Sequence, residues 1–185
     1  MKKYAKLLVP ALFLIIVGGL IYSFSKNTEV TEEFVDYTPA EEISDEQMKR
    51  TKIALFFLDK TTNEIIKDEK YIRTTLLIDE PAKALINEII NSTPLENTLC
   101  PLNSYKQFNN IIIEKNISIL DLSKEFFNHG LSTIKQEENL IQCIVNTLCQ
   151  LNEIDGVKIL VDGEPLEQSN LGLNLSQTFL PTNVS

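Results

Sequence analysis

Metal-binding side chains are scarce in this sequence. It has one histidine, His129, and three cysteines, Cys100, Cys143 and Cys149. Cys143 and Cys149 fall on one expected helix, separated by a rotation of about 600°, so they neither share a metal ion nor bridge each other. A lone histidine beside Gly130 in a loop is typical of a solvated side chain. We therefore expect no metal site and no cofactor.

The odd number of cysteines leaves the thiol chemistry open. One internal bridge at most can form, with the remaining thiol free or paired between chains. Cys149 lies next to an apolar helical stripe and is expected to be a small buried side chain. A disulfide from Cys100 to Cys143 or Cys149 stays an alternative, whereas a catalytic thiol is disfavoured.

Basic residues are too few for a nucleic-acid partner. The chain has 17 Lys and Arg against 26 Asp and Glu, a net charge of −9. Binding to phosphates needs clustered cations. The one Lys-rich stretch is within the first six residues.

Enzyme motifs are also lacking. Ser132 to Lys135 matches Ser-x-x-Lys, but the companion elements of penicillin-binding proteins are absent. Glu137 and Glu138 fall in the first turn of a helix, where the macrodipole accounts for them. Asp121 and Asp162 on separate strands remain a conceivable carboxylate pair, although an Asp before Gly is ordinary turn chemistry. We expect no catalytic, cofactor-binding or metal-ligating residues, and no enzyme.

What the sequence does contain begins with an apolar segment, residues 1–26. Leu7 to Phe24 is a run of 18 uncharged residues, which is about enough to cross a ~30 Å hydrocarbon core. Lysines flank it on both sides: Lys2, Lys3 and Lys6 before it and Lys26 after it. The pattern predicts a single-pass membrane anchor with a cytoplasmic N-terminus and an extracytoplasmic C-terminal domain.

A cleaved signal peptide is the competing interpretation of this segment. Tyr22 and Phe24 stand where small residues precede a cleavage site, which favours a retained anchor. A lipoprotein signal needs a Cys directly after the apolar run, and the first is Cys100.

The remaining chain divides by composition. Residues 27–50 are acidic with little apolar periodicity, which predicts a flexible stalk. Residues 51–176 alternate strand and helix patterns, and residues 177–185 are expected to form a loose tail. The expected elements are strands in 53–58, 64–72, 109–113, 117–121 and 157–161 and helices within 79–94 and 134–154, with a possible edge strand in 171–175. Together they predict an α+β domain: a small mixed sheet of about four strands with two helices on one face.

Two polar residues interrupt the second helix. Asn146 and Thr147 lie side by side in an apolar stripe. The Thr147 hydroxyl is expected to bond a carbonyl one turn back. We expect both residues to fasten the end of the helix to the sheet.

Several segments, in order, resemble the GerMN domain of spore germination and sporulation proteins. The most specific are Asp121-Leu122-Ser123, Val145 to Leu148, and Val157 to Gly163; the resemblance covers roughly residues 52–176. It implies a non-enzymatic module, similar to the ring-building domains of trans-envelope assemblies in sporulating bacteria. The chain departs from the family pattern in holding one copy, in having a membrane span in place of a lipobox, and in lacking a Gly-Pro after the first helix.

These observations predict a membrane-anchored scaffold or interaction module of sporulation or germination assemblies. Exposed strand edges would bind other envelope proteins or a second copy. The alternative is an extracytoplasmic sensing module that binds a small ligand or a cell-wall fragment.

Overall fold

A hairpin opens the ordered domain. A computed structural model describes residues 49–128 and 130–183. Strands β1 (Arg50–Asp59) and β2 (Ile65–Arg73) pair antiparallel, and β3 (Thr98–Leu99) adds to the far end of β1. The Asp59 carboxylate accepts the N–H groups of Thr61 and Thr62 at 2.7 and 2.8 Å, which fixes the turn. The predicted hairpin is confirmed.

A second sheet contains the hairpin β4 (Phe108–Glu114) and β5 (Ile117–Leu122), with β6 (Gly156–Val161) parallel to β5. Lys115 and Asn116 form the two-residue turn with φ of 49° and 63°. Two successive positive φ values give a turn whose twist matches that of the strands. The predicted turn and both of its strands are confirmed.

The two main helices are α3 (Pro81–Ile90) and α4 (Ile134–Leu148). Pro81 starts α3, where its missing N–H costs nothing. The Thr133 hydroxyl caps α4 by accepting the Gln136 N–H at 3.2 Å. The Gln136 side chain returns to the N–H of Ser132 at 3.0 Å, one residue earlier than in a standard capping box. Short 3-10 helices are η1 (Thr74–Leu77), η2 (Tyr105–Gln107) and η3 (Lys124–Phe127).

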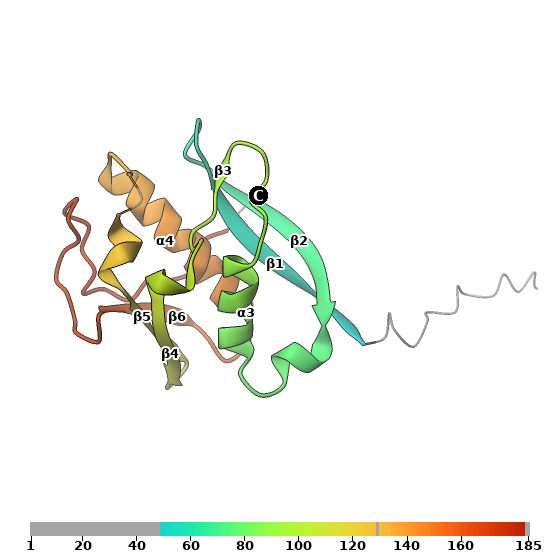
Figure 1. Cartoon of the computed structure of the whole chain (residues 1–185). Helices are drawn as coiled ribbons and strands as arrows, with labels where there is room; N and C mark the ends of the chain where they lie inside the picture. The colour runs from blue at the N-terminus through green and yellow to red at the C-terminus, as the bar shows by residue number, and fades with distance from the viewer. Residues whose placement is uncertain (1–48, 129, 184–185) are drawn as a thin grey trace, which may run out of the picture. The chain divides into compact units, whose positions relative to one another are not determined.

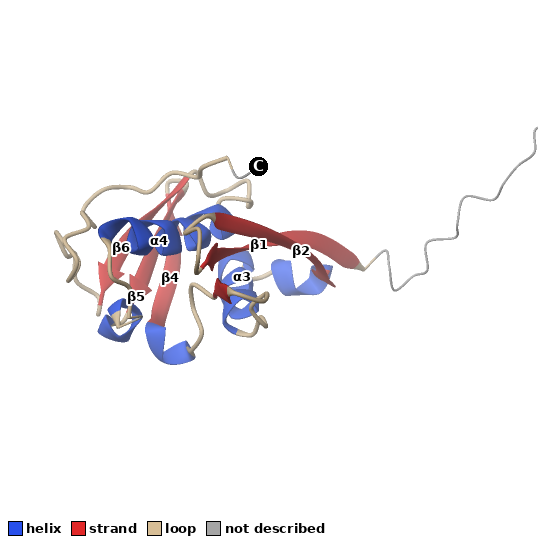
Figure 2. Ribbon diagram, turned by 90° about the horizontal axis from the view of Figure 1, so that it is seen from above, coloured by secondary structure: helices blue, strands red, loops and turns tan. Residues whose placement is uncertain are grey.

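The α+β class is confirmed, but the single sheet is wrong. The strands form two three-stranded sheets, ordered β2-β1-β3 and β4-β5-β6. Figures 1 and 2 show α3 between the β1–β2 hairpin and β4. Helix α4 packs against β1, β2, β6 and α3, and all residues from Leu140 to Leu148 are buried. A helix that touches both sheets must be buried on most of its circumference, so one core serves both.

The open edge of β1 is completed by a side chain. Gln150 accepts the Ala54 N–H and donates to the Ala54 carbonyl, both at 2.9 Å. The amide thus pairs with Ala54 as a neighbouring strand would. It satisfies two backbone groups beyond the reach of the short β3.

The segment after β6 differs from expectation. Residues 171–175 form no strand, only an isolated bridge between Gln168 and Asn174. The expectation of a loose segment from Gln177 is also wrong. Phe179 is 5% exposed and exchanges two 2.8 Å backbone hydrogen bonds with Val157 on β6. This C-terminal segment, residues 177–182, is thus held to the sheet by apolar burial and backbone pairing.

The predicted anchor and most of the predicted stalk, with His129, lie outside the described residues. Within the part of the chain that the structure describes, no helix is both long and apolar enough to span a bilayer.

Candidate interaction surface

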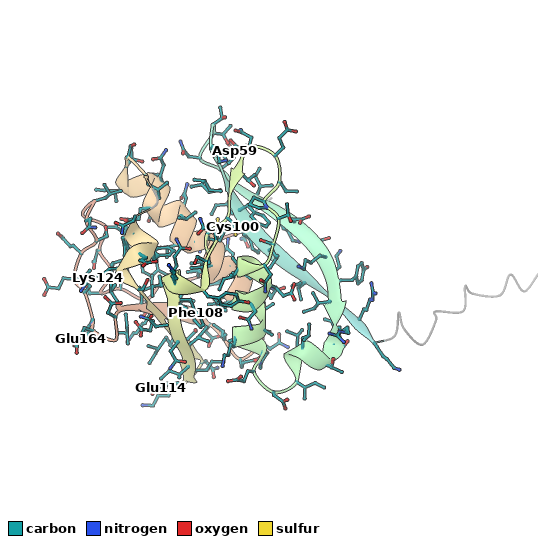
Figure 3. All side chains as sticks on the ribbon, in the orientation of Figure 1. Asp59, Cys100, Phe108, Glu114, Lys124 and Glu164 are labelled. Atoms are coloured by element: carbon teal, nitrogen blue, oxygen red, sulfur yellow. The ribbon has the colours of Figure 1, made fainter. Side chains whose placement is uncertain are left out.

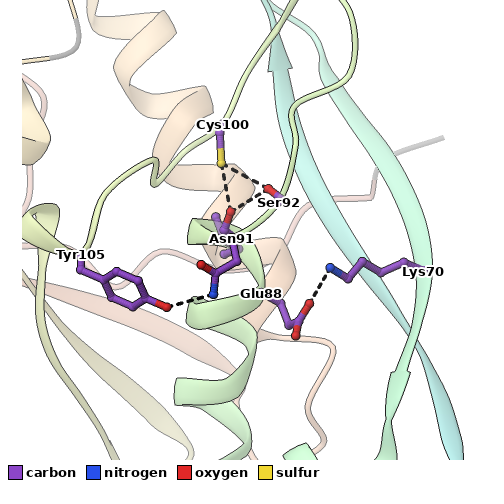
Figure 4. Close-up of polar contacts among 7 residues, drawn as sticks. Lys70, Glu88, Asn91, Ser92, Cys100 and Tyr105 are labelled. Carbon is purple, nitrogen blue, oxygen red and sulfur yellow. Dashed lines mark hydrogen bonds and ion pairs between the residues drawn. The ribbon is translucent and has the colours of Figure 1, made fainter.

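The cysteines are buried to different degrees. Cys100 donates to the carbonyl of Leu102 at 2.9 Å. It also donates to the carbonyl of Ile89 at 3.2 Å and lies 3.5 Å from the Ser92 hydroxyl (Figure 4). Burial raises the pKa of Cys100 and Cys143, and raises that of Cys149 to about 11. All three are free thiols, and Cys149 is only partly buried, less than predicted. Protonated, enclosed thiols are poor nucleophiles.

Close to Cys100, two polar contacts hold α3 in place. Asn91 donates to the Tyr105 hydroxyl at 2.9 Å, and Lys70 of β2 pairs with Glu88 at 2.5 Å (Figure 4). These contacts join α3 to η2 on one side and to β2 on the other.

Glu137 and Glu138 have separate structural roles. Glu138 lies just beyond the first turn of α4, which contains Glu137, and it pairs with Lys135 at 2.9 Å on the surface. Glu137 is 2% exposed and accepts a hydrogen bond from the Ser169 hydroxyl. Burial raises the pKa of the Glu137 carboxyl, and the Ser169 bond offsets part of the rise. Glu137 therefore holds the 164–173 loop against α4. This role differs from the expected interaction of its carboxylate with the helix dipole.

Asp121 and Asp162 come to the same end of the second sheet. Asp121 accepts the Gly163 N–H at 2.8 Å, and Asp162 pairs with Lys124 at 3.4 Å. Asp162 and Gly163 form the turn after β6 with φ of 52° and 82°. The Asp121 carboxylate thus stabilises this turn with positive φ, whereas the Asp162 carboxylate links the turn to Lys124 of η3.

Asn146 and Thr147 are structural, but only part of their predicted role is confirmed. Thr147 donates to the Cys143 carbonyl at 2.9 Å, as expected. Asn146 binds the C-terminal segment and not the sheet: its side-chain oxygen accepts the Thr182 N–H at 2.9 Å. Gln142 donates to the same oxygen and to the Leu180 carbonyl, both at 2.9 Å. The sequence signal that was missed is the four-residue spacing of two amides on one helix face.

Among residues 49–128 and 130–183, no three His, Cys, Asp or Glu side chains gather closely enough to hold a metal ion. The surface feature that remains is the edge of the second sheet. Its β6 edge is occupied by Phe179 and, at the far end, by Glu164, whose backbone bonds Val161. Within the described residues β4 pairs only with β5, so its outer edge is open.

The open β4 edge is apolar. Phe108 to Ile113 contains no charge and no proline, and Ile112 and Ile113 are 45% and 38% exposed. Figure 3 places Glu114, the last residue of β4, at the margin of the domain. Proteins usually protect such edges with charges, proline or a covering segment. The exposed backbone and isoleucines are suited to bind another extended segment.

One face of the second sheet is also uncovered. Leu120, Ile159 and Val161 point into the core, so the opposite face carries Ile112, Ile119 and Lys158 in one cross-strand row. Ile119 is half-buried and Lys158 is exposed. This face extends the apolar character of the β4 edge.

A hollow beside the turn after β6 has a volume of about 490 Å³. Lys124 and Phe127 of η3 line one wall; Asp162, Glu164 and Leu166 line the other. Its size is within the range of small-molecule sites.

The profile of the Germane family, described as "Sporulation and spore germination", matches residues 54–167. That is well over half of the chain. The chain belongs to the Germane family. The resemblance to GerMN-domain proteins is thereby confirmed, and no curated protein is significantly similar in sequence.

Two solved structures share the Germane fold. The first GerMN domain of the sporulation protein GerM from Bacillus subtilis matches with a TM-score of 0.56 at 20% identity, over 71% of this chain and 97% of that chain. The tandem GerMN domains of the same protein match with a TM-score of 0.54 at 16% identity, over 73% and 47%. The chain thus spans about half the length of the tandem structure. At these identities the likeness is one of fold alone.

Proposed function

We propose that this Germane domain is a non-enzymatic interaction module, held at the cell membrane by residues 1–26 and acting outside the membrane in sporulation or germination assemblies. The observation that carries the proposal is the open β4 edge, where residues 108–113 carry no charge, in a sheet whose opposite edge is closed by the C-terminal segment. An open edge can add a partner strand through main-chain hydrogen bonds.

The test is in-cell crosslinking of tagged, full-length protein during spore formation, with identification of the captured proteins by mass spectrometry. Ile112→Lys places a charge on the β4 edge and is expected to lose most captured partners. Ile78→Lys is the matched control, because Ile78 is 67% exposed and lies in the link between η1 and α3, outside the β4–β5–β6 sheet. Equal capture by both variants, or no captured protein with the wild type, would contradict the proposal. Hydrolysis of peptidoglycan or peptides by the purified protein would contradict its non-enzymatic part.

A second candidate function is the sensing of a small ligand or cell-wall fragment. The hollow beside η3 favours it, since Lys124 and Asp162 offer both signs of charge at its rim. A ligand that binds only the folded protein stabilises it by RT ln(1 + [L]/Kd), so it raises the melting temperature as its concentration increases. Wall fragments that raise the melting temperature of the wild type, but not of a Lys124→Ala variant, would support it. No shift across a fragment series would count against it.

A further inference from the structure

If β4 is the contact edge of the proposed function, the structure also indicates which partner binds there. We propose that two copies of this chain pair through β4, antiparallel and about a two-fold axis at Ile112. The result is one continuous six-stranded sheet, ordered β6-β5-β4-β4-β5-β6.

Backbone geometry decides which β4 groups are available. Glu114 and Ile117 flank the two-residue turn and therefore form a hydrogen-bonded pair. Because hydrogen-bonded and non-hydrogen-bonded pairs alternate along an antiparallel ladder, Ile112 also bonds toward β5. The N–H and C=O groups of Ile111 and Ile113 consequently point to the open edge.

The two-fold register uses these groups fully. With Ile112 opposite itself, Ile111 of each copy faces Ile113 of the other, and both residues bear outward backbone groups. Asn110 then lies opposite Glu114, so no like charges oppose each other. The isoleucines of both copies meet on both faces of the new sheet, which removes their exposed surface from water.

Strand β2, the other long edge strand, is protected against such pairing. Lys67, Asp68, Glu69 and Lys70 are four consecutive charges on it, and Lys67 pairs with Glu69 at 2.6 Å. Bringing two such strands together would desolvate these charges. The contrast between the two edges favours β4 as the strand that pairs.

A single strand pair buries less than the roughly 1,000 Å² of a stable complex, so the dimer is weak in dilute solution. Attachment of two copies to one membrane raises their effective concentration. The pairing is therefore best sought on full-length protein in cells.

Disulfide trapping tests the register directly. In a non-hydrogen-bonded antiparallel pair the Cα atoms lie about 4.5 Å apart, a distance that a disulfide can bridge. In a Cys149→Ala background, oxidation of Ile112→Cys is expected to give a disulfide-linked homodimer. Asn110→Cys alone and Glu114→Cys alone should remain monomeric, whereas co-expression of the two should give the dimer.

Monomeric Ile112→Cys, or dimer from Asn110→Cys alone that equals the Ile112→Cys dimer, would overturn the two-fold pairing. The wider function is judged separately by the captured partners. If Ile112→Cys stays monomeric while Ile112→Lys still loses heterologous partners, self-pairing is refuted and the interaction function stands. If Ile112→Lys loses nothing, both are refuted.

Discussion

At the scale of single residues, Ser118 stands out in the core because its hydroxyl makes no hydrogen bond with any residue that the structure describes. It lies on β5, fully buried, and among the described residues its hydroxyl is the buried side-chain oxygen or nitrogen without a hydrogen-bond partner. A buried hydroxyl that bonds nothing loses its hydration without compensation.

Ser118→Ala is therefore expected to raise the free energy of unfolding by about 1 kcal/mol. Urea denaturation at neutral pH measures the change. Ser132→Ala is the control, since Ser132 is exposed and should change little. A less stable Ser118→Ala protein would show that the hydroxyl has a bonding role.

Glu137 makes stability depend on pH in an unusual direction. Because burial raises its pKa, the folded protein keeps the Glu137 proton over a range in which the unfolded chain has released it. Its contribution to stability is thus highest below the unfolded pKa of about 4.3 and falls as pH rises through the raised folded value.

Glu137→Gln has no such proton and keeps an oxygen to accept the Ser169 hydroxyl. Relative to the wild type, the variant is expected to gain stability as pH rises from 4.5 to about 7. Denaturation midpoints across this range measure the difference, and Glu138→Gln, at a half-buried carboxylate of the same helix, is the control. Parallel curves for wild type and Glu137→Gln would contradict the burial argument.

At the scale of elements, the contact between β6 and the C-terminal segment depends on a glycine. A Cβ on Gly156 would lie 2.9 Å from Thr178 Cγ2 and 3.0 Å from the Phe179 carbonyl oxygen. A 3.0 Å approach to a carbonyl oxygen is tighter than nine in ten real Cβ contacts, so a larger residue must displace the segment by a few tenths of an ångström.

Gly156→Ala is expected to cost about 1–3 kcal/mol and to speed amide exchange at Val157 and Phe179. Asn146→Ala should speed exchange at Thr182 without altering β6, because it removes the acceptor of that N–H. The exposed Asn170→Ala is the neutral control. Unchanged protection in Gly156→Ala would mean that the segment is not held as described.

Elements with local signals could be predicted from sequence, whereas contacts between distant segments could not. Pro81 and the Thr133 cap identify both helices, and the polar turn residues identify both hairpins. No local sequence pattern tells whether the strands form one sheet or two. The answer depends on whether the later strands pair with an edge of β1 or with one another. The Gln150–Ala54 pairing likewise joins residues far apart in sequence.

The roles of the candidate site residues also divide into those with a local sequence signal and those set by contacts with distant segments. The turn at Asp162 could be predicted from its neighbouring glycine. The partners of Asn146 and Glu137 lie in the last part of the chain, where periodicity gives no signal. The sequence predicted exposed strand edges in general but not which edge is exposed. That β4 is the open edge depends on how the C-terminal segment covers the edge at β6.

At the scale of the whole molecule, α4 makes the two sheets one cooperative unit. Ile144 is fully buried in the core that the sheets share. Ile144→Ala is expected to cost about 2–5 kcal/mol and to lower amide protection in β2 and β5 by equal amounts. Hydrogen exchange measures both strands in one experiment, and the exposed Ile134→Ala is the control. Loss confined to one sheet would show that the sheets unfold separately.

The position of the C-terminal segment also sets the order in which the fold is completed. Chains are synthesised from the N-terminus, so every helix and strand of the domain exists before Phe179 can pair with Val157. During that interval β4 and β6 are both open edges, and mistaken strand pairing is then most probable. Residues 177–182 thus cover the β6 edge only after the strand itself has been made. Damage to them should appear first as aggregated nascent protein, before any loss of stability in the molecules that do fold.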